Sequence, residues 1–221
     1  MCGRFSLAVL PDTLARHFSL SGVPALGPRY NIAPSRDIAA IRQGGQGREC
    51  VPLRWGLVPA WSDEPKTRYS TINARAETVA DKPAYRQSFR HRRCLIPATG
   101  FYEWQQAGDG RIPHHIRRKD GGLFAFAGLW DRWEKAETTL ESCTIIVTAA
   151  NKLMAPIHDR MPVILDPDRY ADWLDPDNTD RDALLAMLVP CTENALEAWP
   201  VSRRVNNPAN DSPECLAAEM S

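Results

Sequence analysis

Cys2 is the residue of this chain with the widest chemical scope. Because cysteine is small, we expect methionine aminopeptidase to remove Met1 and leave a free α-amine beside the Cys2 thiol. The amine could condense with an aldehyde to an imine, and the thiol could then close on the same carbon to give a thiazolidine. These groups titrate near about 7.7–8.0 and about 8.5, so both are partly nucleophilic at neutral pH. The alternative is an inert Cys2.

Three further polar residues lie in apolar or small surroundings, and each has two interpretations. If residues 100–104 form a strand, Glu103 shares a face with Phe101, where burial would raise the carboxyl pKa and suit a general acid. Otherwise Glu103 faces solvent. His158, in a proline-bracketed turn, could carry protons or stabilise its loop. Asn73 could orient a nucleophile or cap a helix that starts just after it.

A row of basic residues follows Asn73. Lys82, Arg86 and Arg90 are spaced by four residues within a segment, 76–93, that is helix-like apart from a proline. On a helix they would form one cationic stripe, which Arg93 extends. Such a stripe suits an anionic partner.

Other basic and aromatic residues point to nucleic acid. Arg4, Arg75 and Arg160 each lie within two residues of a candidate catalytic group, which favours an anionic substrate such as a phosphate backbone. Three tryptophans could stack on unpaired bases or belong to the core: Trp55, Trp61 and Trp104. Of these, Trp61 lies in the most loop-like segment and is expected to be exposed.

Composition indicates an ordinary globular protein. The chain has 221 residues, of which 43% are hydrophobic and 24% charged. It opens without the apolar region of a signal peptide and holds no apolar run long enough to span a membrane. We therefore expect a cytoplasmic protein, associated with the nucleoid when bound to DNA, with no membrane partner.

The six cysteines are scattered without a C-x-x-C pair, and the histidines have no zinc-like spacing. We expect no metal, no cofactor and no disulfide framework. The net charge of zero hides an asymmetry: residues 1–120 carry 19 basic and 10 acidic side chains, and residues 121–221 carry 8 and 17. The basic half suits a polyanion, although the halves could simply neutralise each other.

Many short strands with few helices predict an α+β fold, because no regular βαβ alternation is present. We expect one domain over residues 1–221, a monomer, with a mixed or antiparallel barrel-like sheet core flanked by short helices. Helices are predicted at residues 11–18, 168–174 and 181–188, the last two in an acidic helical C-terminal part, 166–221. Strands are predicted at residues 37–41, 51–55, 94–96, 100–104, 112–117, 123–128, 143–148 and 196–201.

Six motifs in one order resemble the SRAP family of abasic-site-processing proteins, first described as SOS-response-associated peptidases. They span residues 2–162 and read MCGRF, RYNIAP, RWGLVP, INARAET, RCLIP followed by GFYEW, and IHDRMP. Each motif is short, but six in order are specific. The segment 176–196 matches least.

The resemblance implies covalent crosslinking to abasic sites in single-stranded DNA. By position, Cys2 would be the nucleophile, Asn73 would orient it, and Glu103 and His158 would transfer protons. The implied phosphate contacts are Arg4, Arg75 and Arg160. The stripe residues Arg86 and Arg90 and the aromatic residues Trp61 and Trp104 complete the expected DNA surface. Strand cleavage by an AP lyase reaction and self-processing at Cys2 are further implied activities.

Two other classes of function fit the same residues. A Met-Cys-Gly start also opens N-terminal-nucleophile hydrolases, in which the thiol attacks an amide carbonyl, as in a peptidase or glutaminase. A non-covalent single-strand-binding module with an inert Cys2 would bind intact and abasic strands alike.

Overall fold

A closed five-stranded barrel forms the centre of the molecule. The computed structural model describes residues 2–24, 27–67 and 69–219. Strand order runs β10-β4-β3-β6-β9, and the pairing of β9 with β10 closes the ring. The barrel strands are β3 (Asp37–Gly44), β4 (Gly47–Trp55), β6 (Arg93–Ala98), β9 (Phe124–Lys135) and β10 (Thr138–Ala149).

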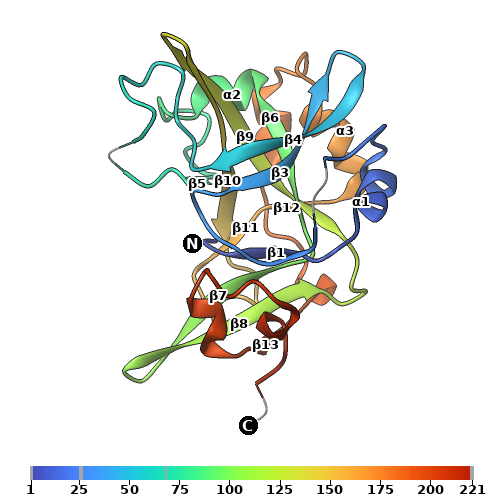
Figure 1. Ribbon diagram of the computed structural model, residues 1–221, viewed down its shortest axis with the longest axis vertical. Coiled ribbons are helices and arrows are strands. Elements are labelled where there is room, and N and C mark those ends of the chain that lie inside the picture. The colour runs from blue at the N-terminus through green and yellow to red at the C-terminus, as the bar shows by residue number, and fades with distance from the viewer. Residues whose placement is uncertain (1, 25–26, 68, 220–221) are drawn as a thin grey trace.

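A second, antiparallel sheet lies beside the barrel, in the order β13-β8-β7-β1-β2. In Figure 1, β1 lies between the barrel strands and the strands β7, β8 and β13. These strands are β1 (Phe5–Leu7), β2 (Arg29–Ile32), β7 (Gly100–Ala107), β8 (Gly110–Arg118) and β13 (Leu196–Pro200). The predicted α+β class with a barrel-like sheet core is confirmed.

Short strands and helices surround the two sheets. The short strands are β5 (Asn73–Arg75), β11 (Arg160–Pro162) and β12 (Ile164–Leu165). The α-helices are α1 (Pro11–Phe18), α2 (Arg86–His91), α3 (Tyr170–Leu174) and α4 (Arg181–Ala186), and four 3-10 helices lie at Pro167–Arg169, Glu193–Ala195, Arg203–Asn206 and Pro213–Cys215.

The helix expected over residues 76–93 is largely wrong. Residues 76–81 and 83–85 form turns, and the α-helix begins only at Arg86. Pro83 has no amide hydrogen and disfavours helical dihedrals in the residue before it, so the segment cannot form one continuous helix. Arg93 is also not part of an exposed stripe, because its side chain is buried.

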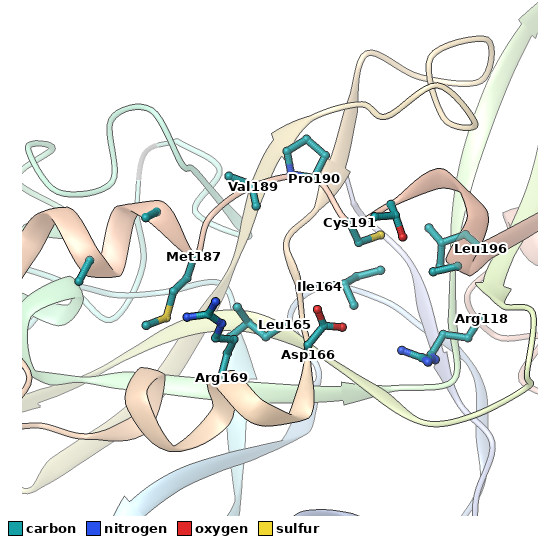
Figure 2. Close-up of a pocket in the computed structure, with 14 residues that line it drawn as sticks. Arg118, Ile164, Leu165, Asp166, Arg169, Met187, Val189, Pro190, Cys191 and Leu196 are labelled. Carbon is teal, nitrogen blue, oxygen red and sulfur yellow. The ribbon is translucent and has the colours of Figure 1, made fainter.

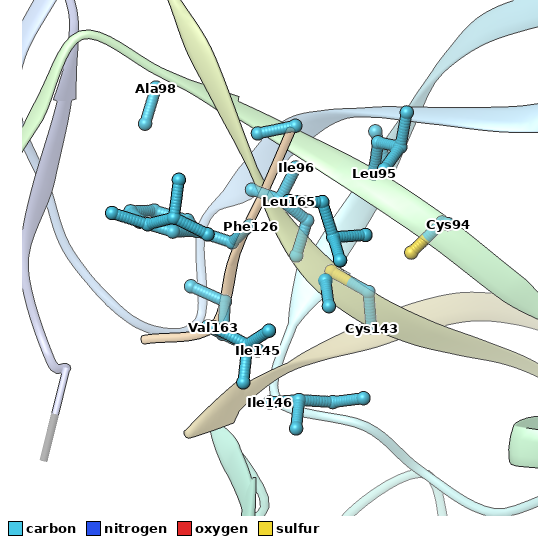
Figure 3. Packing of buried hydrophobic residues seen from close by; sticks show 14 of the residues in the cluster. Cys94, Leu95, Ile96, Ala98, Phe126, Cys143, Ile145, Ile146, Val163 and Leu165 are labelled. Atoms are coloured by element: carbon cyan, nitrogen blue, oxygen red, sulfur yellow. The ribbon is translucent and has the colours of Figure 1, made fainter. Parts of the chain in front are cut away.

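Aromatic packing ties the N-terminal strand to the barrel. The Phe5 ring lies edge-on to Trp55 at 5.3 Å and to Phe126 at 5.8 Å between centroids. Phe126 belongs to a fully buried aliphatic and thiol-lined core that Figure 3 shows between β6, β9 and β10. All six cysteines are free thiols, and five of them are buried. Because Phe5 is anchored, the residues just before it have a fixed position.

Gly100, the first residue of β7, has no room for a side chain. A Cβ atom there would lie 2.2 Å from His115 Nε2 and 2.8 Å from the Ile116 carbonyl oxygen. His115 is buried and contacts Ser6 Oγ at 3.2 Å, so it cannot move easily. Gly100→Ala is therefore expected to lower the free energy of unfolding by about 2–3 kcal/mol.

Urea unfolding measures this effect, with Gly45→Ala as the control. An added Cβ at Gly45 meets nothing within 4 Å, so we expect its free energy of unfolding to change by less than about 0.5 kcal/mol. Equal stability of the two variants would contradict the packing described for β7.

Candidate active site

Strand pairing brings Cys2 beside Glu103. Phe5 pairs with Phe101, and the Tyr102 amide donates to the Arg4 carbonyl at 2.9 Å. The residues before Phe5 therefore run along β7 toward Glu103. Cys2 is fully buried, and Glu103 is 2% exposed on the same face of β7 as the buried Phe101. The prediction that Glu103 points inward is confirmed.

The environment changes the protonation of both groups. Burial raises the pKa of Glu103 to about 7, so a large fraction of this carboxyl is protonated at neutral pH. Burial also raises the pKa of the Cys2 thiol far above its ordinary value, and the Glu103 carboxyl raises it further. The expectation of a partly ionised thiol is wrong for the resting site: Cys2 holds a neutral thiol next to a readily protonated acid.

Asn73 begins strand β5 instead of capping a helix, so the helix-cap interpretation is wrong. It pairs with Ile145 of β10, and its Nδ2 donates to the Ile145 carbonyl at 3.4 Å. Its backbone carbonyl accepts from the Tyr85 hydroxyl at 3.2 Å, and the Trp55 indole holds the preceding carbonyl of Ile72 at 2.9 Å. The Asn73 Oδ1 atom is buried and has no hydrogen-bond partner among the residues that the structure describes. A buried acceptor without a partner lowers the stability of the fold, and it can accept a hydrogen bond from a reactant.

His158 lies at the other edge of β10, just before β11. The Arg160 amide donates to its Nδ1 at 3.0 Å, and the Asp159 Oδ1 atom lies 2.9 Å from the same nitrogen. Burial lowers the pKa of His158 and favours that neutral form. Asp159 acts electrostatically on Glu103, which places this loop near the acid. The His158 ring thus contacts two residues of its own loop through Nδ1.

An ion pair connects the two edges of β10. Val147 pairs with Arg75 on one side and Pro162 on the other, and the Arg160 guanidinium binds the Glu77 carboxylate. Arg75 is exposed, whereas Arg160 is half-buried.

Arg4 has intramolecular partners. Its Nη1 donates to Asn31 Oδ1 at 2.7 Å and to the Val205 carbonyl at 2.7 Å, and its guanidinium lies 5.9 Å from the centroid of the Trp104 ring. A contact between Arg4 and a DNA phosphate stays a prediction. In the structure, Arg4 connects the N-terminal segment that carries Cys2 to Asn31 and Val205.

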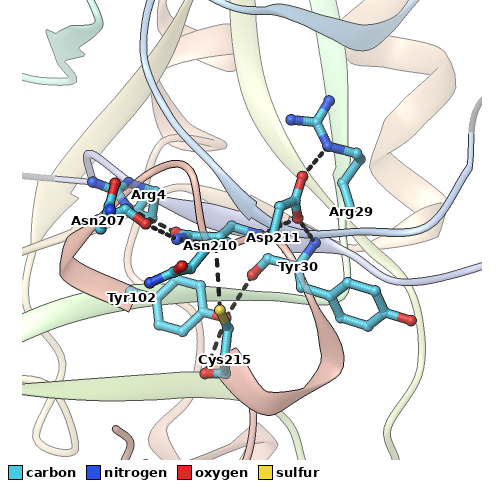
Figure 4. A network of polar contacts seen from close by, with 9 residues as sticks. Arg4, Arg29, Tyr30, Tyr102, Asn207, Asn210, Asp211 and Cys215 are labelled. Carbon is cyan, nitrogen blue, oxygen red and sulfur yellow. Dashed lines mark hydrogen bonds and ion pairs between the residues drawn. The ribbon is translucent and has the colours of Figure 1, made fainter. Parts of the chain in front are cut away.

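Figure 4 shows a polar network that the sequence alone did not reveal. Asp211 accepts from the Asn31 amide at 2.9 Å and pairs with Arg29, and the Tyr102 hydroxyl donates to the Tyr30 carbonyl at 2.6 Å. This network fastens the C-terminal segment over β1, β2 and β7. The RYNIAP motif was the one available signal, since it placed polar residues where an ordinary buried strand would be apolar.

Two of the predicted DNA contacts share a cavity of about 630 Å³. Trp61 and Arg75 line it together with Tyr69, Lys82 and Tyr85. Trp61 is 60% exposed and Tyr69 is 56% exposed, which confirms the expectation for Trp61. Tyr85 also contacts Asn73, so the cavity adjoins that end of the candidate site.

The other tryptophans differ in their surroundings. Trp55 is fully buried in the core. Trp104 lines a shallow hollow of about 450 Å³ with Arg111, Arg203 and Asn206, and its indole donates to Asn206 Oδ1 at 2.8 Å. Arg111 acts electrostatically on His158, so the hollow lies on the His158 side of the candidate site.

Two further cavities lie apart from these residues. Arg86 and Arg90 line one between α2 and α4. The other, about 330 Å³, is lined by groups that include Arg118, Asp166 and Cys191, and Figure 2 shows that none of the predicted site residues contributes to it.

Among the described residues no cluster of three or more potential ligands could hold a metal ion. Within the same part of the chain, no helix combines the length and apolar character needed to cross a membrane.

The comparisons with known proteins agree with this architecture. The model of the family described as SOS response associated peptidase (SRAP) matches residues 1–208. The chain belongs to the SRAP family. The match includes all the predicted catalytic and DNA-binding residues. An SRAP relative from Bacillus subtilis, abasic site processing protein YoqW, is 44% identical over 98% of this chain and 99% of its own length.

More distant SRAP relatives span the whole domain as well. Abasic site processing protein HMCES of Xenopus tropicalis is 38% identical over 99% of this chain and 78% of its own length. A crystal structure of a Bacteroides thetaiotaomicron protein superposes with a TM-score of 0.89 at 27% identity, covering 99% of this chain and 100% of that one.

Proposed function

We propose that this SRAP protein processes abasic sites by forming a covalent thiazolidine crosslink between Cys2 and the aldehyde of an abasic deoxyribose in single-stranded DNA. The observation that supports it most is the neutral Cys2 thiol buried beside Glu103, a carboxyl whose pKa is raised to about 7. The names of the relatives, which are abasic site processing proteins, point to the same lesion.

Glu103 supplies the proton for the first steps. An abasic sugar is mostly a closed hemiacetal, and the Glu103 acid donates to the ring oxygen and takes up the C1′ hydroxyl proton as the ring opens to the aldehyde, so it ends this step protonated. The α-amine of Cys2 then adds to C1′ to give a carbinolamine. Loss of water from that carbinolamine consumes an acidic proton and leaves an iminium ion and the Glu103 carboxylate.

The same carboxylate then serves as the base for ring closure. The Cys2 thiol gives its proton to the Glu103 carboxylate, and the thiolate adds to C1′ of the iminium ion. The product is a thiazolidine with a neutral ring nitrogen, and Glu103 returns to its protonated form. One water is lost overall. Because burial favours the neutral form of the Cys2 thiol, the proposed reaction begins with the amine.

Asn73 and His158 assist from either side in this proposal. The buried Asn73 Oδ1 accepts a hydrogen bond from the amine or the thiol and so orients the nucleophile. His158 exchanges protons with the carbinolamine or during reversal. In this proposal the exposed Trp61 ring and the half-buried Trp104 ring stack on unpaired bases on either side of the site. Nearby arginines bind phosphates without reading sequence.

Intact mass after incubation with a single-stranded oligonucleotide carrying one abasic site tests this proposal. The expected mass is that of the chain without Met1 plus the DNA, less one water. Met1 lies outside the described residues, so its removal must be verified in the same spectrum. A chain that lacks Met1 and gives no adduct would overturn the proposal. Ammonia release from glutamine would then identify the hydrolase alternative.

A further inference from the structure

The cavity between α2 and α4 concentrates positive charge away from Cys2. It has a volume of about 320 Å³. Its principal lining residues are Asp81, Arg86, Phe89, Arg90, Arg181 and Leu184. Three guanidinium groups thus face one carboxylate, in a hollow that also contains apolar side chains. Like charges one helical turn apart destabilise a helix, and a bound anion would relieve that repulsion.

The walls of this cleft are held in place from inside. Arg93 is 3% exposed, and its Nη1 donates to the Phe89 and Arg90 carbonyls at 2.7 and 2.6 Å. The same guanidinium donates from Nε to the Trp173 carbonyl at 2.7 Å and from Nη2 to the Asn178 carbonyl at 3.0 Å. One buried arginine therefore connects the last turn of α2 to the segment that leads into α4.

A second connection closes the cleft from the α4 side. Arg181 Nη2 binds both carboxylate oxygens of Asp81 at 2.9 and 3.0 Å. Arg181 is a basic residue in an otherwise acidic segment, and its ion pair with Asp81 connects it to the basic half of the chain, residues 1–120. The cleft is thus preorganised, and binding there requires little rearrangement.

The basic residues continue from the Trp61 cavity into this cleft. The Arg86 amide donates to the Lys82 carbonyl at 2.9 Å, which is the spacing of one α-helical turn. Lys82 lines the Trp61 cavity, and Arg86 and Arg90 line the cleft. Within α2, the side chains of Arg86 and Arg90 are one turn apart, a spacing of about 5–6 Å. A row of cations that crosses from one cavity to the next fits an extended polyanion better than a compact one.

We propose that Arg86, Arg90 and Arg181 form a second phosphate-binding site, which holds the DNA backbone beyond the nucleotides next to the lesion. This inference rests on the proposed function. It assigns to the SRAP chain a contact that extends its footprint along the strand and increases affinity for long strands, with no part in the chemistry at Cys2.

The test compares abasic strands of two lengths. The short strand carries about two nucleotides on each side of the lesion, and the long strands carry about fifteen more on one side or the other. For Arg86→Ala/Arg90→Ala, the crosslinking rate with the short strand should equal that of the unaltered chain. With one of the long strands, the dissociation constant should rise about tenfold, and its salt dependence should become shallower by about 1.4 in log–log slope.

Two matched variants make the result decisive. Arg16→Ala/Lys119→Ala removes two exposed charges elsewhere and should leave binding unchanged. Asp81→Asn removes the carboxylate that lines the cleft and should tighten long-strand binding severalfold, a gain that misfolding cannot produce.

If the salt dependence of binding is unchanged for the Arg86/Arg90 variant on both long strands, the inference is wrong. This holds even if inorganic phosphate raises the melting temperature of the unaltered chain more than that of the variant, because such a result would show binding of free phosphate and not of the DNA backbone. The proposed function would survive that result, because it depends on crosslinking of the short strand. Loss of short-strand crosslinking by the unaltered chain would instead remove the proposed function.

Discussion

A Cys2→Ala chain is expected to lose the heat-stable crosslink to abasic single-stranded DNA, with a yield at least about 100-fold below that of the unaltered chain. Alanine keeps the α-amine once Met1 is removed, so the imine can still form, but no thiol remains to close the ring. The product should therefore appear only when borohydride is added to reduce the imine. Gel electrophoresis with and without the reductant measures both species.

Structure predicts that this variant remains folded. Cys2 is fully buried but small, so removing its sulfur costs only about 1 kcal/mol of the free energy of unfolding. Non-covalent binding of intact single strands should survive, because the exposed Trp61 and Arg75 are untouched.

Cys191→Ala is the matched control for thiol chemistry. Cys191 is the one cysteine that is not buried, so it is the most accessible competing thiol. Its replacement should leave the crosslink yield unchanged. A heat-stable crosslink formed by Cys2→Ala without reductant would show that another nucleophile reacts, and the thiazolidine proposal would fail.

The sequence predicted the candidate site best in β7, where side chains alternate between the two faces of the strand. In β7 the period of two residues placed Phe101 and Glu103 on one buried face, and the burial of both follows directly. The alternation alone could not predict how far the pKa of Glu103 rises, because the desolvation of this carboxyl depends on which other segments cover that face of β7. Part of that cover is the N-terminal segment that runs along β7, which is distant from Glu103 in sequence.

Asn73 shows where local reasoning failed. The residues after it favour a helix by composition, yet they form β5, which pairs with β10 more than 70 residues later. Tertiary pairing overrode local propensity, as it often does for short segments. The contact of Arg4 with the Val205 carbonyl, 201 residues away, had no sequence signal at all.

The lengths of β9 and β10 were also underestimated. The predicted strands covered residues 123–128 and 143–148, but β9 continues through Asp131 to Lys135 and β10 begins at Thr138. This hairpin extends beyond the barrel with alternating exposure, so its outer part can carry charge. Apolar runs therefore located the barrel but not the ends of its strands.

Glu103→Gln is expected to slow crosslinking by about 100- to 10,000-fold below pH 7, since glutamine can neither donate nor recover the proton. In the unaltered chain the acid is lost as pH rises through about 7, the pKa of Glu103. The rate should therefore decline above that pH, and the decline should be absent from the residual rate of the variant. Initial rates of adduct formation between pH 5.5 and pH 9, read by gel, measure both profiles; these limits lie about 1.5–2 units on either side of the pKa.

The same substitution should increase stability at high pH. The folded pKa of about 7 exceeds the ordinary value of 4.5, so the fold favours the protonated carboxyl. This favourable contribution is fully present below pH 4.5 and is lost as pH rises to about 7. Above pH 7 the buried carboxylate costs on the order of 3 kcal/mol, and glutamine avoids that cost.

Urea unfolding at two pH values separates an acid held for catalysis from a structural one. At pH 8, about one unit above the folded pKa, Glu103→Gln should be more stable than the unaltered chain by about 3 kcal/mol, and at pH 5 this difference should fall to about 1 kcal/mol or less. Glu134→Gln, an exposed control on β9, should change neither value by more than about 0.5 kcal/mol.

A Glu103→Gln variant that crosslinks slowly but is more stable at pH 8 shows that the fold keeps an acid beside Cys2 at a cost in stability. If the variant is no more stable at pH 8, the Glu103 carboxylate of the unaltered chain must be exposed to solvent. The proposed proton transfers through Glu103 would then be wrong.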